Sequence, residues 1–512
     1  MASPNEFNPH KVPIEVAIDK TGFGLYSYTL ISLTGAIIIS SALITYGSTI
    51  LVPASACELQ TNSGQQGALA AAPVVGAIIG VLIWGYLADT RGRWSMLLVS
   101  LIGGAIINMV ASISVNWIML MFFQFLASVM ASGLYSMSMS LMSECVPMAK
   151  RNLVVLLVSS IFLLSQGIMA VIAIPIIPLT FNIELPALGI YWNSWRTLML
   201  VYSVPNIIAA IWLYFMQDSP KFAFAKGDEE KALEILRTIH RINHLSSKEE
   251  YPVKGLLLDS KDVKEGPTSA KEKFFPLFKA PLLKYTLIMT VLFVFQQIAA
   301  FKVWLPTVAN QFIRIIETGE GSGLTLCGVI EASINTPVTE DEVPCALNVN
   351  AMLLVLAIGA LQSVINLLLS TIVNRAGRRN IVMVVAAVCG ISGILVNLVP
   401  NAIGSVLLYA VLLMGIVVFG LYTAIAIAIF PTHLRATAIA IPLMSGRIGS
   451  FASIQILNLM LVNNCDAGFY LFSSVFASSA IIALLLPDDR RLVAAKPSPP
   501  PPEKDESVLT QL

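Results

Sequence analysis

The stretch Gly-Tyr-Leu-Ala-Asp-Thr-Arg-Gly-Arg at residues 85–93 decides the fold, because a shorter copy, Val-Asn-Arg-Ala-Gly-Arg-Arg, stands at 373–379. Both copies lie in a short polar gap between two long apolar runs. Three positions align at a constant offset of 285 residues: Asp89 with Asn374, Gly92 with Gly377 and Arg93 with Arg378. The repeat predicts that the chain consists of two related halves.

The composition around this repeat is that of a membrane protein. Of the 512 residues, 56% are hydrophobic and 12% are charged, whereas a soluble domain carries about 25% charged residues. Lys and Arg (31) nearly cancel Asp and Glu (30), so the net charge is +1 and offers no footprint for nucleic acid. These numbers exclude a cytosolic enzyme, a disordered chain and a nucleic-acid binder.

The apolar residues form twelve continuous runs, each near the length of about 20 residues that a helix needs to span a bilayer. Continuous rather than alternating hydrophobicity excludes a transmembrane β-barrel. The sequence therefore predicts an all-α protein with twelve transmembrane helices in two pseudo-symmetric six-helix bundles. The runs are 28–52, 68–87, 95–114, 117–142, 153–178, 196–216, 284–306, 350–373, 381–400, 403–430, 437–462 and 469–486.

Basic residues predict the orientation of these spans. If both termini are cytoplasmic, 27 of the 31 Lys and Arg residues fall on the cytoplasmic side. The predicted parts are an N-terminal tail (1–27), a first bundle (28–216), a linker with a short amphipathic helix (217–283), a second bundle (284–487) and a disordered, Pro-rich tail (488–512). The predicted location is the plasma membrane or an intracellular vesicle membrane.

These motifs resemble those of a known family. Asp-x-x-Gly-Arg after the second span, repeated in the second half, is similar to the major facilitator superfamily. Asp-Ser-Pro-Lys at 218–221 resembles a motif of its sugar-porter branch. Trp-Asn-Ser-Trp-Arg at 192–196 and Val-Trp-Leu-Pro at 303–306 are most similar to the synaptic vesicle glycoprotein two and related-protein group. The resemblance implies a secondary transporter whose solute path lies between the halves.

The resemblance also implies a cytoplasmic gate made of charged helix ends. In such a gate the contacts hold the cytoplasmic side shut and release when the halves rock, whereas the alternative is that the basic residues only determine topology. Gly85 and Gly92 are expected to allow a tight turn and a close backbone approach. The predicted gate residues are Gly85, Asp89, Gly92, Arg93, Glu144, Arg151, Asp218, Arg378 and Arg435.

The interior of the spans contains cations and amides but no acid or His. A proton-coupled carrier normally needs a titrating carboxylate or His in its cavity, so we expect a uniporter or exchanger. Lys302 and Arg447 either snorkel to the membrane surface or line the path, and in the second case an anionic or strongly hydrogen-bonding solute follows. The candidate path residues are Ser41, Gln124, Ser159, Gln166, Gln296, Gln297, Lys302, Trp304 and Arg447. For the amides, hydrogen bonding between helices is the alternative.

Three further expectations complete the prediction. Cys327 and Cys345 bracket one predicted outer segment and form either a disulfide or two free thiols. The terminal residues Leu-Thr-Gln-Leu (509–512) fit a PDZ-type partner, although so short a match is common by chance. No cofactor, metal site or enzyme activity is expected, because the loops contain no nucleophile–base pair and no metal-spaced His and Cys. The partners expected are the lipid bilayer and a small polar organic solute, and a transport-inactive protein acting in trafficking or as a scaffold is the alternative.

Overall fold

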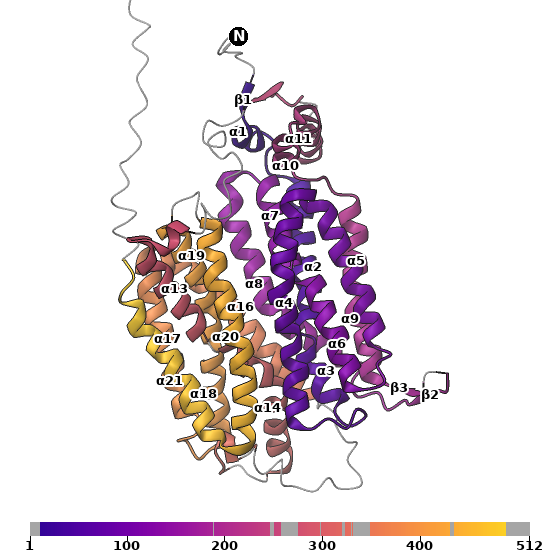
Figure 1. Ribbon diagram of the computed structural model, residues 1–512, viewed down its shortest axis with the longest axis vertical. Coiled ribbons are helices and arrows are strands. Elements are labelled where there is room, and N and C mark those ends of the chain that lie inside the picture. Colours follow the sequence, from indigo (N-terminus) through magenta and orange to yellow (C-terminus); the bar gives the residue numbers. More distant parts are fainter. Residues whose placement is uncertain are drawn as a thin grey trace, which may run out of the picture.

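The computed structural model describes residues 11–187, 189–245, 250–257, 275–296, 298–319, 323–328, 330, 349–430 and 435–487, apart from a few side chains within helices. This part of the chain is almost entirely helical, with the first half and the second half side by side (Figure 1). Gln297, Cys345 and the C-terminal tail lie outside the described residues, as do the side chains of Asp89 and Arg435.

The twelve predicted spans all coincide with helices. Ten helical stretches are long and apolar enough to cross a membrane, and α8 and α20 occupy the two remaining runs. The first half contains α2 (Leu25–Tyr46), α3 (Ser48–Ser55), α4 (Ser63–Arg91), α5 (Arg93–Ala111), α6 (Trp117–Ala131), α7 (Leu134–Cys145), α8 (Met148–Ala173) and α9 (Ser194–Tyr214). The second half contains α13 (Leu282–Phe295), α14 (Ile298–Thr318), α16 (Val349–Ala376), α17 (Arg378–Leu395), α18 (Ala402–Met414), η2 (Gly415–Val417), α19 (Val418–Ile429), α20 (Arg435–Asn463) and α21 (Cys465–Ala483).

Helix packing across the boundary follows a reciprocal pattern. The second span of the first half, α4, packs against the fifth span of the second half, α20, and α8 packs against α16 in the converse way. A two-fold axis produces this exchange, because each surface then meets its counterpart in the other half. The two motif glycines agree with the repeat, since Gly92 and Gly377 both precede a helix with a positive φ, of 100° and 81°.

Four spans are interrupted along their length. The α2–α3 span bends at Gly47, the α6–α7 span at Ser132 and Gly133, and the α18–α19 span passes through the 3-10 turn η2. The α13–α14 span is broken more sharply, because Gln296 leaves the helical region with a ψ of 70°. Interrupted transmembrane helices are the elements from which transporter binding sites are built.

A small extramembrane unit, which we call the cap, covers one end of the first half (Figure 1). Its strands β1 and β4 pair in parallel, and its helices α10 and α11 are separated by Gly227 at a φ of 86°. Leu233, Leu236 and Ile239 of α11 are buried, as the predicted amphipathic helix requires. The cap comprises β1 (Lys11–Pro13), α1 (Ile14–Asp19), α10 (Pro220–Ala225), α11 (Glu229–Asn243) and β4 (Gly255–Leu257).

Three short elements lie outside the bundles and the cap. Strands β2 (Ile183–Leu185) and β3 (Ile190–Trp192) form an antiparallel hairpin before α9, and the 3-10 helix η1 (Phe275–Phe278) precedes α13.

The halves are joined at the end opposite the cap. One large hydrophobic cluster contains residues of both halves, and its members from the first half come from that end, such as Leu51, Leu69 and Met199. A second cluster consists only of the cap and the cap end of the first half, including Ile18 and Leu236. The described structure is therefore closed at the end opposite the cap.

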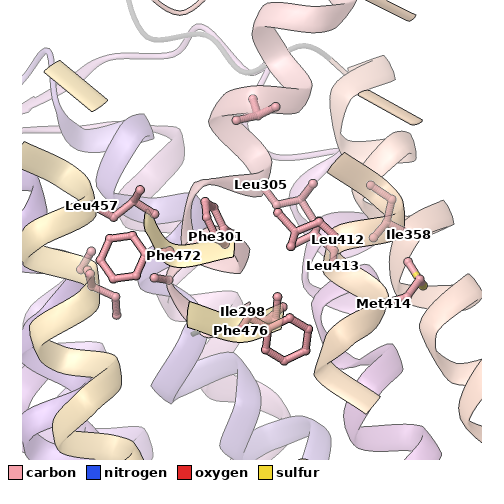
Figure 2. Close-up of a cluster of buried hydrophobic side chains, with 14 of the residues drawn as sticks. Ile298, Phe301, Leu305, Ile358, Leu412, Leu413, Met414, Leu457, Phe472 and Phe476 are labelled. Atoms are coloured by element: carbon pink, nitrogen blue, oxygen red, sulfur yellow. The ribbon is translucent and has the colours of Figure 1, made fainter. Parts of the chain in front are cut away.

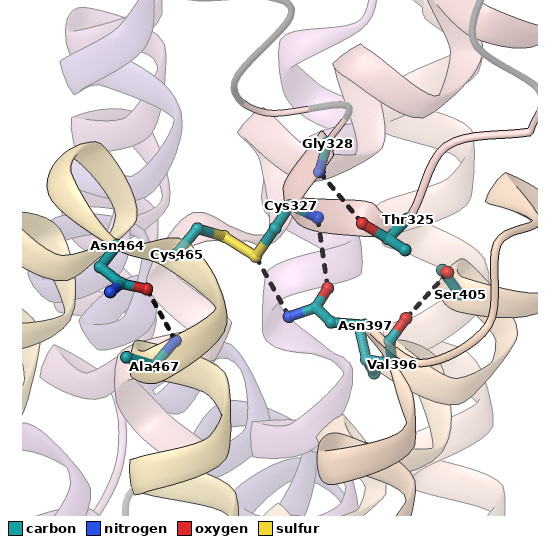
Figure 3. The surroundings of a disulfide bond; sticks show 9 residues. All are labelled: Thr325, Cys327, Gly328, Val396, Asn397, Ser405, Asn464, Cys465 and Ala467. Atoms are coloured by element: carbon teal, nitrogen blue, oxygen red, sulfur yellow. Dashed lines mark hydrogen bonds between the residues drawn. A yellow bond between two sulfur atoms is a disulfide. The ribbon is translucent and has the colours of Figure 1, made fainter.

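The predicted disulfide between Cys327 and Cys345 is wrong. Cys327 is bonded to Cys465 at the start of α21, across a separation of 138 residues (Figure 3). Asn397 supports the bond, because its side chain accepts from the Cys327 amide at 3.2 Å and donates to the Cys327 sulfur at 3.1 Å. Cys57 is also disulfide-bonded, whereas Cys145 and Cys389 are buried free thiols.

Candidate functional site

The cap end of the first half holds a compact charge cluster centred on Glu144. This residue ends α7, and its carboxylate pairs with Arg93 at 3.2 Å and accepts hydrogen bonds from Ser140 and Ser219. Ser219 caps α10, so the cluster ties the start of α5 and the end of α7 to the cap. Arg93 and Glu144, two of the predicted gate residues, thus contact each other. Asp218 Oδ1 accepts a local hydrogen bond from the Ser219 amide.

The glycines of the motif differ in their surroundings. A Cβ placed on Gly92 would lie 2.8 Å from the Phe222 ring of α10, so this position requires glycine both for its positive φ and for its contact with the cap. A Cβ placed on Gly85 would meet no atom within 4 Å. The expected close approach is therefore present at Gly92 and wrong for Gly85.

Arg151, which we predicted as part of the same gate, has an acidic partner from an unexpected source. Its Nη2 lies 3.1 Å from Glu15 of α1, and Lys221 of α10 pairs with the same carboxylate. Burial alone would raise the pKa of Glu15, but the hydrogen bonds and charges of Lys221 and Arg151 outweigh it and hold that pKa below its ordinary value of 4.5. Nothing in the polar composition of the first 27 residues indicated this contact.

Arg378, the counterpart of Arg93 in the second half, has a different setting. Its Nη1 donates to the Ala424 carbonyl of α19 at 3.0 Å. Arg378 thus contacts a backbone carbonyl, whereas Arg93 contacts the Glu144 carboxylate.

Hydrogen bonds join the halves from the end opposite the cap to the middle of the spans. Those nearest to the cap are made by Asn366 and Arg447. Of the predicted path residues, Gln166 and Arg447 bond to the other half. The bonds run from Gln455 to the Gly67 carbonyl (3.2 Å), from Gln166 to the Lys302 carbonyl (3.2 Å), from Arg447 to the Ala77 carbonyl (2.8 Å), from Ser363 to the Ser160 carbonyl (3.1 Å) and from Asn366 to the Ser160 hydroxyl (3.1 Å).

The break in the α13–α14 span lies among the predicted path residues Gln296 and Lys302. Gln296 donates to the Gly415 carbonyl at 3.2 Å and so links two interrupted spans. Ile298 and Phe301 then anchor α14 in the core beside Phe476 and Phe472 (Figure 2). Lys302, the next residue, is deeply enclosed by protein yet keeps accessible surface.

Two buried polar atoms on the predicted path have no hydrogen-bond partner among the described residues: Trp304 Nε1 and Gln124 Oε1. A buried polar group without a partner is destabilising, so a solute or water is expected at such an atom. Two other predicted path residues have local partners. Ser41 donates to the Ala131 carbonyl at 3.1 Å and Ser159 to the Val155 carbonyl at 2.8 Å.

An aromatic group at the boundary was missed by the sequence prediction. Tyr46 and Tyr135 each pack edge-on against Phe162, with ring centroids 6.1 and 5.4 Å apart. Tyr46 ends α2 and Tyr135 follows the interruption between α6 and α7, so the bent spans of the first half present these rings. Tyr46 also interacts with Arg447 of the other half, and both tyrosines keep more than a third of their surface exposed. Aromatic residues within apolar runs give no sequence signal of this kind.

A second missed cluster lies at the end opposite the cap. The Arg196 guanidinium is 1% exposed and pairs with Glu58 at 2.6 Å. It also donates to the carbonyls of Ser112 and Ser114, at 2.7 and 2.9 Å, and lies 4.4 Å from the Trp195 ring. These contacts join α9 to the loops after α3 and α5 at this end of the first half, so we assign Arg196 a structural role.

The polar side chains at the boundary between the halves are either positively charged or neutral. Among described side chains, every Asp, Glu and His lies outside the interior of the spans, in the cap, the loops or the helix ends. The described residues also contain no group of three His, Cys, Asp or Glu that could hold a metal ion. The boundary can therefore bind a solute through hydrogen bonds, ring stacking and positive charge.

Comparison with known proteins agrees with this architecture. The human SVOPL protein is 24% identical over 489 residues, which are 94% of this chain and 92% of that protein. The bovine synaptic vesicle 2-related protein is 26% identical over 245 residues, covering 46% of this chain and 41% of its own length. Rat solute carrier family 22 member 3 is 28% identical over 175 residues, covering 34% and 29%.

Solved structures show the same fold. The inward-open conformation of the xylose transporter XylE from E. coli superimposes with a TM-score of 0.63 at 15% identity, over 90% of this chain and 97% of that chain. The family described as the Major Facilitator Superfamily matches residues 34–454. The resemblance predicted from the repeated motif is thus confirmed, and the chain belongs to the Major Facilitator Superfamily.

Proposed function

We propose that this transporter-family chain moves a small organic anion across a membrane by alternating access, as a uniporter or exchanger. The observation that carries the proposal is that two interior cations of the second half meet the first half: the Lys302 carbonyl accepts from Gln166, and the Arg447 guanidinium donates to the Ala77 carbonyl. Two cations in a boundary without described acids attract an anion, because a charge in a low-dielectric site favours an opposite charge.

The surrounding groups suit the rest of such a solute. Tyr46, near Arg447, and Tyr135 each keep more than a third of their surface exposed, and Trp304 Nε1 is a buried donor without a partner among the described residues. A flat organic carboxylate would stack on the rings and pair with the guanidinium. A sugar would need hydroxyl-binding amides, but Gln166 and Gln296 already donate to backbone carbonyls of Lys302 and Gly415.

The coupling mode follows from the same residues. Proton coupling through a membrane-embedded carboxylate or His requires such a group at the boundary, and the described spans place none there. We therefore expect the solute gradient, or exchange against a second solute, to drive net movement.

The test is solute uptake into proteoliposomes that contain the purified protein. The probes are benzoate, succinate, glucose and tetraethylammonium, each measured with and without a pH gradient and with the same solute inside the vesicle. The proposal predicts uptake of benzoate that is stimulated by internal benzoate and is not accumulated by the pH gradient. Arg447→Gln and Lys302→Gln should each reduce this uptake at least about tenfold, since each removes one charge-assisted contact. The control Lys254→Gln changes an exposed lysine of the cap.

Other outcomes decide against the proposal in distinct ways. Uptake of glucose or tetraethylammonium in place of the acids would contradict the anion assignment, and accumulation driven by the pH gradient would contradict the coupling argument. No uptake of any probe would favour a carrier-fold protein that acts in trafficking or as a scaffold. The similarity to synaptic vesicle 2-related protein is the observation that favours this second candidate function.

A further inference from the structure

The cap ends of both halves carry positive charge. In the first half the described cations at this end include Arg91, Arg93, Lys150, Arg151 and Lys221, and in the second half they include Lys279, Lys284, Arg378 and Arg379. Alternating access requires these two ends to approach each other when the cap end closes. Like charges that approach within about 10 Å repel at physiological ionic strength, so closure needs acids at this end.

Two carboxylates of the first half pair with three of these cations. Glu144 pairs with Arg93, and Glu15 pairs with both Arg151 and Lys221. The side chains around Glu15 keep between 23% and 31% of their surface, so these pairs are partly shielded from water and from the salt that would weaken them. Glu15 is thus the partner of two of the three cations.

The segment that carries Glu15 is fixed to the cap and to α8. Asp19 accepts a hydrogen bond from the Met148 amide at the first turn of α8, at 2.7 Å. Tyr251 donates to the Ala17 carbonyl at 2.6 Å, and Asn243 donates to the carbonyls of Thr21 and Gly22. This packing explains why Ala17 and Ile18 have no exposed surface.

We propose that Glu15 is a gate residue of the transport cycle and that the segment 11–24 holds its carboxylate over the first turns of α8 and α10. By pairing with Arg151 and Lys221, Glu15 offsets one of their two positive charges and so weakens the repulsion between the cap end of the first half and the described cations at the cap end of the second half. The segment 11–24 is then a positioning element of the gate and not a free tail. The inference rests on the alternating access proposed above and is independent of the solute.

The first experiment measures the distance between the cap ends without any solute. Spin labels are attached at Met148→Cys on α8 and Ile372→Cys on α16, in a background with Cys145→Ala and Cys389→Ala, and double electron–electron resonance gives the distance distribution in lipid nanodiscs. We expect a long and a short distance in the wild type. Glu15→Gln should reduce the short, closed population about fivefold, because a partly exposed charge-assisted pair is lost.

Two controls separate a gate from a merely structural role. Glu230→Gln removes an exposed carboxylate from the same cap and should leave both populations unchanged. Raising KCl to 1 M should restore the short distance in Glu15→Gln, because salt screens the repulsion, whereas a misfolded cap would not recover.

The outcomes distinguish the gate from the proposed function. Two populations with an unchanged ratio in Glu15→Gln, or a loss that 1 M KCl does not reverse, would refute the role of Glu15 and leave alternating access intact. A single long distance in every variant and salt concentration would refute alternating access itself, and the gate with it.

Discussion

Replacing Arg196 by methionine should destabilise the first half by about 3–5 kcal/mol, the range found when one partner of a buried ion pair is removed. Methionine fills a similar volume, so the loss comes from the polar contacts. The carbonyls of Ser112 and Ser114 lose a buried donor, at about 1–3 kcal/mol for an unsatisfied group. The Glu58 side chain contributes less, because 23% of its surface is exposed and Asn193 and Trp195 still donate to it.

The two buried free thiols allow each half to be followed separately. Cys145 lies in α7 of the first half and Cys389 in α17 of the second, and a thiol-reactive fluorophore labels either one only after local unfolding. In a Cys389→Ala background, Arg196→Met should lower the temperature at which Cys145 reacts. In a Cys145→Ala background, the temperature for Cys389 should fall less.

The matched control is Arg241→Met, which removes an exposed arginine from α11. Combining Arg196→Met with Glu58→Gln should destabilise less than the sum of the two, by about 1–3 kcal/mol of coupling. The reasoning fails if Arg196→Met behaves like the control, or if Cys389 rather than Cys145 becomes the more reactive thiol.

Three further outcomes are expected. Replacing both Cys327 and Cys465 by serine, in the Cys145→Ala background, removes the disulfide without leaving another free thiol and should lower the stability of the second half by about 2–5 kcal/mol. Cys389 should then label at a lower temperature, whereas an unchanged labelling temperature would contradict the expectation. The pKa of Glu15 in the folded protein lies below 4.5, so its stabilisation of the cap is complete above pH 4.5 and is lost as the pH falls through that lower pKa. Hydrogen exchange of residues 11–24 in the wild type should therefore become faster at this low pH. In Glu15→Gln the exchange rate should show no such rise between higher and low pH. Gly167→Val should weaken the contact between the halves, because even a Cβ at this position would lie 2.9 Å from the Leu356 side chain. Spin labels on the two halves at the end opposite the cap should then move apart. An unchanged distance would contradict close packing at Gly167.

The sequence was sufficient for the spans and insufficient for their interruptions. Run length and hydrophobicity are properties of 20-residue windows, so the twelve helical segments could be predicted from them. A bend such as that at Gly47 or Gly133 changes the backbone of one or two residues inside an apolar run, and hydropathy does not report it. For this reason Tyr46 and Tyr135, which these bends present, were not among the predicted path residues.

The contacts between distant segments were also beyond the sequence. The polar residues before the first span have the composition of a tail, and only the fold brings Asp19 to the start of α8 and Thr21 to Asn243. The four cysteines of the predicted outer segments allow three pairings, and spacing alone cannot choose among them. The sequence left open a disulfide between Cys327 and Cys345 or two free thiols, but Cys465 is the bonded partner of Cys327.

The separation of the two hydrophobic clusters has a consequence for biogenesis. The cluster that joins the cap to the first half draws its members from Ile14 to Leu256, all of which leave the ribosome before the second half is made. The cap end of this half can therefore bury its own interior while translation continues, as amino-terminal domains commonly do. The other cluster needs residues as late as Leu486, so the finished amino-terminal bundle serves as the template on which the nascent second bundle assembles.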